Sequence, residues 1–256
     1  MVTATAAFIF PPAAGHTNPA LPLCQRLVTL GWRVEFLSVP EFKSAIEGTG
    51  AAYLDRDAVF AELGFEDYVA KVRGTFAEYG DPSSSMWAPN FGSIATERTL
   101  PLHIKLLQRI SPQLVVYCPV LSQVAHLAAM HLSIPDVSLL TTAGPGFYDA
   151  AFATHGGSAA GLVATIKANE PNAKAIDAVR LLMKMPELTL NTAEPLIHEH
   201  YTGVNLVTTV PSMADKLNEK DSEFYRSAGK AFEFVGPLLG GQQVTMAGAL
   251  PDAEAA

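Results

Sequence analysis

The sequence predicts an α/β fold in which a parallel sheet is flanked by helices. Short, continuous apolar runs alternate with helical patterns along most of the chain, and such alternation favours parallel strands joined by right-handed crossovers. Apolar residues make up 49% of the 256 residues and charged residues only 16%. This composition excludes disorder and indicates long buried strands, in a chain long enough for one large domain or two small ones.

The first part of the chain alternates strand and helix patterns. An apolar run that ends at two prolines is typical of a buried strand, and helix-start residues before a long apolar spacing predict the helix after it. β-Branched and aromatic residues indicate two further strands around a short helix. These elements are expected at residues 4–10 (strand), 15–31 (helix), 33–38 (strand), 41–48 (helix) and 51–54 (strand).

The middle of the chain, residues 58–110, is expected to be mostly helical. Gly, Asp, Pro and Ser interrupt the pattern at residues 80–85, and the loop that they predict is a candidate wall for a binding pocket. The alternation of strand and helix then resumes. Its elements are expected at residues 114–118 (strand), 122–132 (helix) and 137–140 (strand).

The last part begins with residues 141–161, which are rich in Gly, Ala and Thr. We expect them to form a loop over the C-terminal edge of the sheet, where open α/β folds bind ligands. A helix is then expected around residues 176–185 and two short strands at 205–210 and 232–237. Residues 1–238 are therefore interpreted as one domain, and residues 239–256 as a linker or tail.

Charge and cysteine content exclude several classes of function. The formal net charge of −8 repels phosphate backbones and acidic lipid, so nucleic-acid binding is not expected. Cys24 and Cys118 are far apart and form no Cys-x-x-Cys pair, so neither a disulfide framework nor a zinc site is indicated. No uninterrupted apolar stretch is long enough to span a membrane, and no targeting signal is recognisable. We expect a cytoplasmic protein.

His16 is the leading candidate for a catalytic residue. It follows the first predicted strand at the start of the first predicted helix, at the edge where α/β active sites usually lie. The positive end of the helix would keep a neutral imidazole from protonating, which favours a general base near pH 7. The alternative is a histidine that caps the helix and bonds a backbone carbonyl.

Other polar clusters are interpreted as structural. Asp55-Arg56-Asp57 matches the Asp-x-Asp of metal-dependent sugar transferases but is explained more simply as a solvated helix start. His198-Glu199-His200 is expected at the surface, and His126 and His131 do not share a helix face as zinc ligands would. The chain contains no Gly-x-Ser-x-Gly, P-loop or Gly-x-Gly-x-x-Gly motif, so hydrolase, kinase-like and dinucleotide-binding functions lose their usual support.

Several stretches together resemble one enzyme family. The stretch Gly15-His16-Thr17-Asn18-Pro19-Ala20-Leu21-Pro22-Leu23, with residues 31–36 and 48–51, resembles the opening of the nucleotide-sugar-dependent glycosyltransferases of the macrolide and plant type, the family 1 UDP-glycosyltransferases. Later stretches agree in the same order, so that the resemblance covers nearly the whole chain. These are residues 111–117, 133–139, 205–209 and 232–239.

The resemblance implies the N-terminal half of a GT-B fold, that is, a Rossmann-like parallel sheet flanked by helices. Members of the family have two such domains, the first holding the sugar acceptor and the second the nucleotide sugar. The family's donor motif is missing here, since His155-Gly156-Gly157 lies inside the N-terminal pattern without the residues that should follow. The resemblance thus implies a UDP-sugar held by a C-terminal domain or a separate subunit, with no cofactor bound by this chain alone and no metal.

The site implied by the resemblance departs from the family at one position. In the family a carboxylate, within a pattern like Val-Val-Tyr-Asp-Pro, orients the histidine base, and the matching stretch here is Val115-Val116-Tyr117-Cys118-Pro119. His16 would be the general base, and Cys118 stands at the position of the aspartate. A neutral thiol stabilises an imidazolium less well than a carboxylate does, whereas a thiolate paired with the imidazolium is the alternative.

The function implied is transfer of a sugar, with inversion, to a hydroxyl of a hydrophobic small molecule. Since the base lacks its carboxylate, either a slower enzyme or a sugar acceptor that ionises readily, such as a phenol, is expected. A non-catalytic aglycone-binding or partner-activating subunit is the competing hypothesis. The cleft wall that would face the second domain would be an exposed apolar patch, which favours association with another chain as a heteromer. The expected acceptor-pocket residues, for which packing roles are the alternative, are Asn18, Trp87, Phe91, Thr142 and Phe147.

Overall fold

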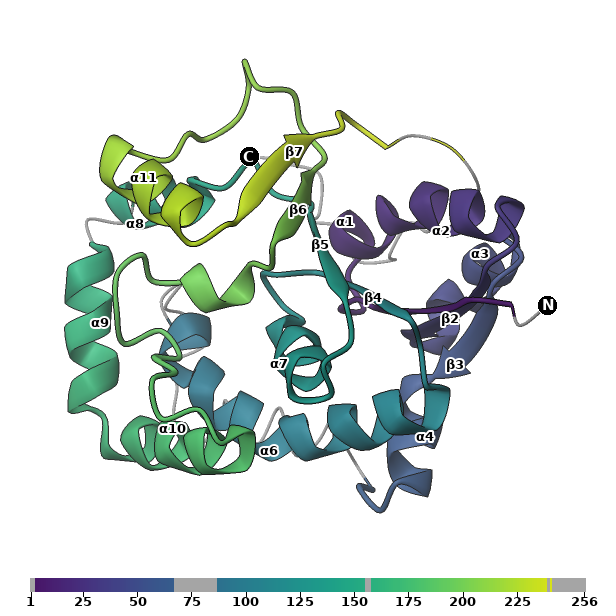
Figure 1. The fold of residues 1–256 in the computed structure, drawn as a ribbon, viewed down its shortest axis with the longest axis horizontal. Helices are drawn as coiled ribbons and strands as arrows, with labels where there is room; N and C mark the ends of the chain where they lie inside the picture. Colours follow the sequence, from purple (N-terminus) through teal and green to yellow (C-terminus); the bar gives the residue numbers. More distant parts are fainter. Residues whose placement is uncertain (1–2, 67–86, 155–157, 239, 241–256) are drawn as a thin grey trace, which may run out of the picture.

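The computed structural model describes residues 3–66, 87–154, 158–238 and 240. These residues form a seven-stranded sheet in the order β3-β2-β1-β4-β5-β6-β7 (Figure 1). Every pair of neighbouring strands is parallel. The strands are β1 (Thr5–Ile9), β2 (Arg33–Ser38), β3 (Ala52–Asp55), β4 (Leu114–Tyr117), β5 (Asp136–Leu140), β6 (Val204–Val207) and β7 (Ala231–Phe234). The predicted fold class is confirmed, and each predicted strand has a counterpart.

Helices cover both faces of the sheet (Figure 1). On one face lie α1 (Ala14–Thr17), α2 (Ala20–Thr29) and α3 (Lys43–Glu47), the last preceded by the 3₁₀ turn η1 (Pro40–Phe42). The remaining helices are α4 (Arg56–Glu62), α6 (Trp87–Ile110), α7 (Gln123–His131), α8 (Phe147–Thr154), α9 (Ala159–Ala168), α10 (Glu170–Met183), the 3₁₀ turn η2 (His198–His200) and α11 (Glu219–Ser227).

Two hydrophobic clusters fill the space between the sheet and its helices. Phe8, Phe36 and Phe42 are fully buried in the cluster beneath α2 and α3. Leu106 of α6 and Leu127 of α7 are buried in the larger cluster on the other face. Because both faces of the sheet are covered at its centre, the central strands β1 and β4 are continuous apolar runs rather than alternating ones, and this is why they could be recognised in the sequence.

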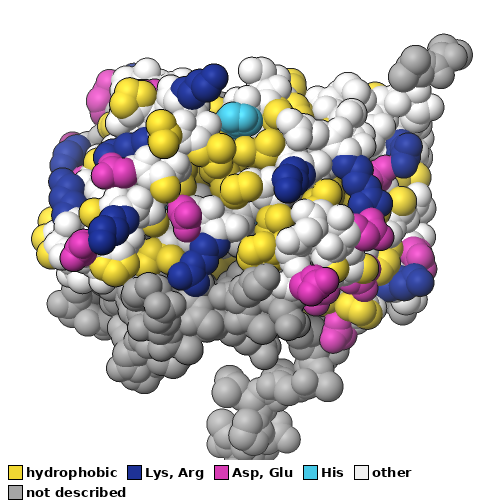
Figure 2. Space-filling view, turned by 90° about the horizontal axis from the view of Figure 1, so that it is seen from below, with side chains coloured by type: hydrophobic (Ala, Val, Ile, Leu, Met, Phe, Trp, Pro, Cys, Tyr) yellow, Lys and Arg dark blue, Asp and Glu magenta, His cyan; other side chains and the backbone are white. Residues whose placement is uncertain are grey.

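The outer face formed by the lower helices of Figure 1 is mixed in character. Figure 2 shows hydrophobic side chains gathered near its centre beside a histidine, with charged side chains of both signs around them. Leu181 of α10 is 82% exposed. In the described part of the chain, no helix is long and apolar enough to cross a membrane.

Four helices correct the expectations from sequence. The predicted loop at residues 141–161 contains α8, because its alanines are strong helix formers and outweigh the flanking glycines. The helix expected around residues 176–185 begins earlier, at Glu170, where Asn169 caps it, and α9 precedes it. Helix α11 is not predicted by the sequence pattern, since it buries only Asp221 and Tyr225 and so has almost no apolar stripe.

The helix expected from residue 15 onward is in fact two helices. The four-residue α1 contains His16 in its last turn, and α2 begins at Ala20 with Pro19 as its N-cap. Thr17 ties α1 to the end of the first strand by donating from Oγ1 to the Pro11 carbonyl at 2.7 Å. The predicted loop at residues 80–85 and most of the tail at 239–256 lie outside the described residues.

Candidate active site

Three neighbouring strands bring the candidate site together. His16 follows β1, Cys118 follows β4 directly, and Thr141 follows β5. The strands β1, β4 and β5 are adjacent and parallel, so their carboxyl ends share one edge of the sheet. The chain reverses its direction across the sheet between β1 and β4. Such a switch point is where open α/β sheets bind ligands.

The His16 ring is held through one nitrogen. Its Nδ1 lies 2.9 Å from Oγ1 of Thr141 and 3.3 Å from Sγ of Cys118. No described residue forms a hydrogen bond with its Nε2. When Nδ1 carries the proton and donates to the Thr141 hydroxyl, Nε2 is unprotonated and can accept a proton from a ligand.

All groups that hold His16 are neutral near pH 7. Burial raises the pKa of the Cys118 thiol to about 11, and this favours a neutral thiol over a thiolate paired with an imidazolium. Thr141 carries no charge either. The geometry therefore reproduces the orienting role of a carboxylate without its charge, and nothing in the contacts of Nδ1 stabilises a protonated ring electrostatically.

The reason why His16 stays neutral differs from the one expected. Burial lowers the pKa of His16, because a partly desolvated imidazolium is less stable. The sequence suggests the positive end of a helix instead. The structure gives burial as the cause, and it places His16 in the last turn of the short α1, before α2 begins.

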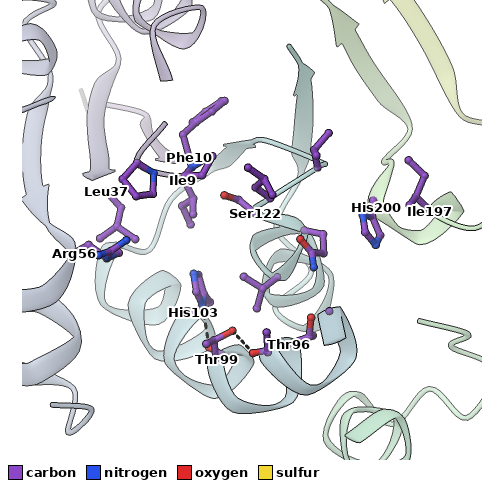
Figure 3. Close-up of a pocket in the computed structure, with 18 of the residues that line it drawn as sticks. Ile9, Phe10, Leu37, Arg56, Thr96, Thr99, His103, Ser122, Ile197 and His200 are labelled. Atoms are coloured by element: carbon purple, nitrogen blue, oxygen red, sulfur yellow. Dashed lines mark hydrogen bonds between the residues drawn. The ribbon is translucent and has the colours of Figure 1, made fainter. Parts of the chain in front are cut away.

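A pocket of about 320 Å³ opens beside this part of the sheet edge. Its wall includes Phe10, Pro11 and Pro12, which lead from β1 to α1, and Val120 to Val124, which follow Cys118 (Figure 3). Much of the remaining wall is apolar or aromatic, with Ile9, Leu37, Phe60 and Ile197 among its members. Concave, largely apolar pockets with a few polar groups are the usual binding sites for small organic molecules.

Two buried histidines belong to this pocket, and the sequence did not identify either. His103 of α6 and His200 of η2 are 3% and 7% exposed and both line the pocket. The prediction that His198-Glu199-His200 lies at the surface is wrong for His200. The turn is pulled inward because Tyr117 donates to the His200 carbonyl at 2.8 Å, while the Glu199 carboxylate accepts the backbone N–H groups of Thr189 and Leu190.

The expected acceptor-pocket residues lie around the site rather than in the pocket wall. Asn18 ends α1, Thr142 follows the residue that holds His16, and Phe147 begins α8 and packs edge-on against Tyr148, which does line the pocket. Asn18, Thr142 and Phe147 do not themselves line it. Trp87 and Phe91 belong to α6, but their side chains are outside the described part. The acceptor-binding roles of all five residues stay predictions.

The other polar motifs have structural partners. Asp55 caps α4 by accepting the backbone N–H groups of Asp57 and Ala58, each at 3.1 Å, as a helix start would. His126 is buried and pairs with Asp136, whereas His131 is exposed. Residues 155–157 lie outside the described part. Within the described ranges, no three His, Cys, Asp or Glu side chains gather as a metal site.

Comparison with known proteins places the fold. No family model matches the chain, and no curated protein matches it by sequence. Solved structures do match. The glycotransferase of kitacinnamycin is 19% identical with a TM-score of 0.61, and the match covers 98% of this chain and 55% of that one. The calicheamicin glycosyltransferase CalG4 is 18% identical with a TM-score of 0.57, with coverage of 94% and 54%.

A third structure agrees with the first two. The glycosyltransferase SnogD from Streptomyces nogalater is 18% identical, with a TM-score of 0.51 and coverage of 99% and 57%. This chain has the Rossmann-like fold of one half of a GT-B glycosyltransferase. It spans about half the length of the structures that it matches, in accord with the N-terminal half that the sequence resemblance implies.

Proposed function

We propose that this chain is the acceptor-binding part of an inverting glycosyltransferase that moves a sugar from a nucleotide sugar, a UDP-sugar by resemblance, to a hydroxyl of a hydrophobic small molecule. One observation carries the proposal. His16 is held at Nδ1 by Thr141 and Cys118, and no described residue bonds its Nε2. The ring lies at the sheet edge beside an apolar pocket, although His16 itself does not line that pocket. The fold shared with glycosyltransferases supports it.

In this mechanism Nε2 of His16 takes the proton of the acceptor hydroxyl. The hydroxyl oxygen attacks the anomeric carbon of the sugar as the bond from that carbon to the nucleoside diphosphate breaks on the opposite face, which inverts the configuration. The protonated ring keeps its Nδ1–H toward the Thr141 hydroxyl. No metal is needed, and a C-terminal domain or a separate subunit would hold the nucleotide sugar.

The missing carboxylate sets the expected rate. General-base assistance is typically worth about 10²–10⁴ in rate, and part of it depends on stabilising the imidazolium. With Cys118 and Thr141 both neutral, we expect slow transfer to alkyl hydroxyls. Phenols should react faster, because their oxygen gives up its proton more easily.

The test begins with the mass and composition of the native assembly, followed by a sugar-transfer assay on the same sample. His16→Ala should lower the transfer rate by about 10²-fold or more, while His131→Ala, which changes an exposed histidine, should leave it unchanged. A second polypeptide that binds the nucleotide sugar would account for the donor site. Transfer that is insensitive to His16→Ala would exclude His16 as the base.

A second candidate is a non-catalytic subunit that binds an aglycone or activates a partner. The neutral Cys118 at the position of the family's carboxylate favours it. In that case an assembly with its partner should transfer sugar equally well whether this chain is the wild type or the His16→Ala variant, and the isolated chain should still bind a hydrophobic aglycone.

A further inference from the structure

The pocket contains two histidines that the proposed mechanism does not use. His103 rises from α6 toward Ile9 and Leu37, and His200 lies on the opposite side of the pocket beside Ile197 (Figure 3). Phe60 packs edge-on against the His103 ring, with the ring centres 5.2 Å apart. The His103 side chain is therefore a fixed part of the wall.

Backbone carbonyls determine which nitrogen of each ring carries the proton. Nδ1 of His103 lies 3.0 Å from the Thr99 carbonyl oxygen, and Nδ1 of His200 lies 2.9 Å from that of Pro119. A carbonyl oxygen can only accept, so Nδ1 must donate in both rings. In a neutral imidazole the other nitrogen, Nε2, is then unprotonated and can only accept a hydrogen bond.

Burial keeps both rings neutral near pH 7. It lowers the pKa of His103 to about 4 and that of His200 to about 3. No described residue donates a hydrogen bond to either Nε2. The wall of the pocket thus includes two ring nitrogens that can only accept and that no described residue pairs. A ligand that displaces water from them without donating a hydrogen bond leaves them unpaired, which is costly.

We infer that His103 and His200 select the ligand of this pocket, which is a largely apolar molecule bearing at least two hydroxyl groups that donate to the two Nε2 atoms. The inference rests on the proposed function in that this ligand would be the sugar acceptor. Ligands whose hydroxyls are methylated leave both nitrogens unpaired.

Calorimetric titration with matched probes tests this selection on the protein as isolated. A naphthalenediol should bind at least about tenfold more tightly than its dimethyl ether, since one lost or unpaired buried hydrogen bond costs about that factor. His103→Phe keeps a ring in place but removes the acceptor, and should shrink this preference about tenfold. His103→Gln, which can still accept, should retain most of it.

Matched controls separate the ligand class from the catalytic proposal. His131→Phe makes the same chemical change outside the pocket and should not alter binding, and a thermal unfolding curve checks that each variant is folded. Equal binding of diol and ether, no binding of either, or a preference unchanged in His103→Phe would overturn the inference. His16-dependent sugar transfer would still stand in those cases, whereas loss of that transfer with the diol preference intact would overturn only the proposed reaction.

Discussion

At the scale of single residues, the contacts of His16 separate two roles that one carboxylate usually combines. Thr141 and Cys118 orient the ring through Nδ1, but neither supplies a negative charge. Orientation and charge stabilisation can therefore be changed independently in this site. A change at Cys118 tests the charge, because Thr141 continues to hold the ring.

Cys118→Asp should speed transfer, given that His16 is the base. A carboxylate at the position of Sγ, 3.3 Å from Nδ1, would raise the pKa of His16 by about 1–3 units and stabilise the imidazolium that forms during attack. We expect kcat/KM to rise about tenfold or more. Cys118→Ala, which removes a neutral group, should change it less than about threefold. A slower Cys118→Asp enzyme that is still folded would contradict this view of the site.

The pH dependence of transfer should also report the protonation of His16. Burial lowers the pKa of His16 below its ordinary value, so the ring stays unprotonated and active at pH values where a free histidine, with a pKa of about 6.5, is already charged. The acid limb of kcat/KM against pH, measured with a neutral hydroxyl acceptor, should therefore lie below about pH 6.5. In Cys118→Asp the limb should move to higher pH, and a limb at the same pH in both proteins would argue against His16 as its origin.

How much of the site was predictable depends on how local its signals are. His16 and Cys118 stand in short stretches that resemble a known family, and the structure brings them together. Thr141 has no such signal, because it reaches His16 only through the pairing of distant strands. His200 is misjudged from sequence since the alternation of His and Glu is typical of a solvated segment, and only the Tyr117 and Glu199 contacts pull it inward.

At the scale of elements, the start of α8 depends on a close backbone approach. Gly146 donates its N–H to the Asp215 carbonyl at 2.9 Å, and a Cβ at Gly146 would lie 2.3 Å from the Lys216 carbonyl oxygen. The residues before α8 and those after β6 can meet in this way only without a side chain between them.

Gly146→Ala should therefore destabilise the protein. The added methyl group forces two backbone segments apart, and overpacking of this kind costs about 1–3 kcal/mol. Gly15→Ala is the matched control, because a Cβ there meets nothing within 4 Å and alanine favours the helix. Urea unfolding of both variants measures the difference. Equal stability of the two would show that the segments separate freely.

The central strands were predictable because they carry a continuous apolar pattern, as for Leu114–Tyr117. The helices that were not predicted either lacked such a pattern or stood beside residues that are typical of loops. Helix α11 has only two aromatic residues, Phe224 and Tyr225, among polar ones, and α8 lies among glycines that suggest a loop. Their positions are decided by packing against the sheet, which local sequence does not encode.

At the scale of the whole molecule, the buried histidines make stability depend on pH. The folded-state pKa of His103 is lowered to about 4, so below its ordinary value of about 6.5 the unfolded chain binds a proton that the folded one does not. The free energy of unfolding is thus unaffected above about pH 6.5 and falls as the pH drops from there toward about 4. His103 alone accounts for up to about 3 kcal/mol of this loss.

His103→Phe should accordingly flatten the acid side of the stability curve. Denaturant unfolding at about pH 7 and about pH 4.5 measures how far the free energy of unfolding falls in each protein. The fall should be larger in the wild type than in the variant by about 2 kcal/mol. His131→Phe should behave like the wild type, since that histidine is exposed. If the free energy of unfolding fell equally in the wild type and in His103→Phe, His103 would be protonated as easily in the folded protein as in the unfolded one.

The order of the strands also has a consequence for the route by which the site forms. The His16–Cys118 contact joins residues 102 positions apart, and the His16–Thr141 contact joins residues 125 positions apart. During synthesis, His16 leaves the ribosome long before either partner exists. Strand β1 must wait for β4, whereas β2 can already pair with β1, and β3 with β2. Closing such long loops is entropically costly and slow. The polypeptide thus passes through partly folded species in which His16 is present but its contacts with Cys118 and Thr141 have not yet formed.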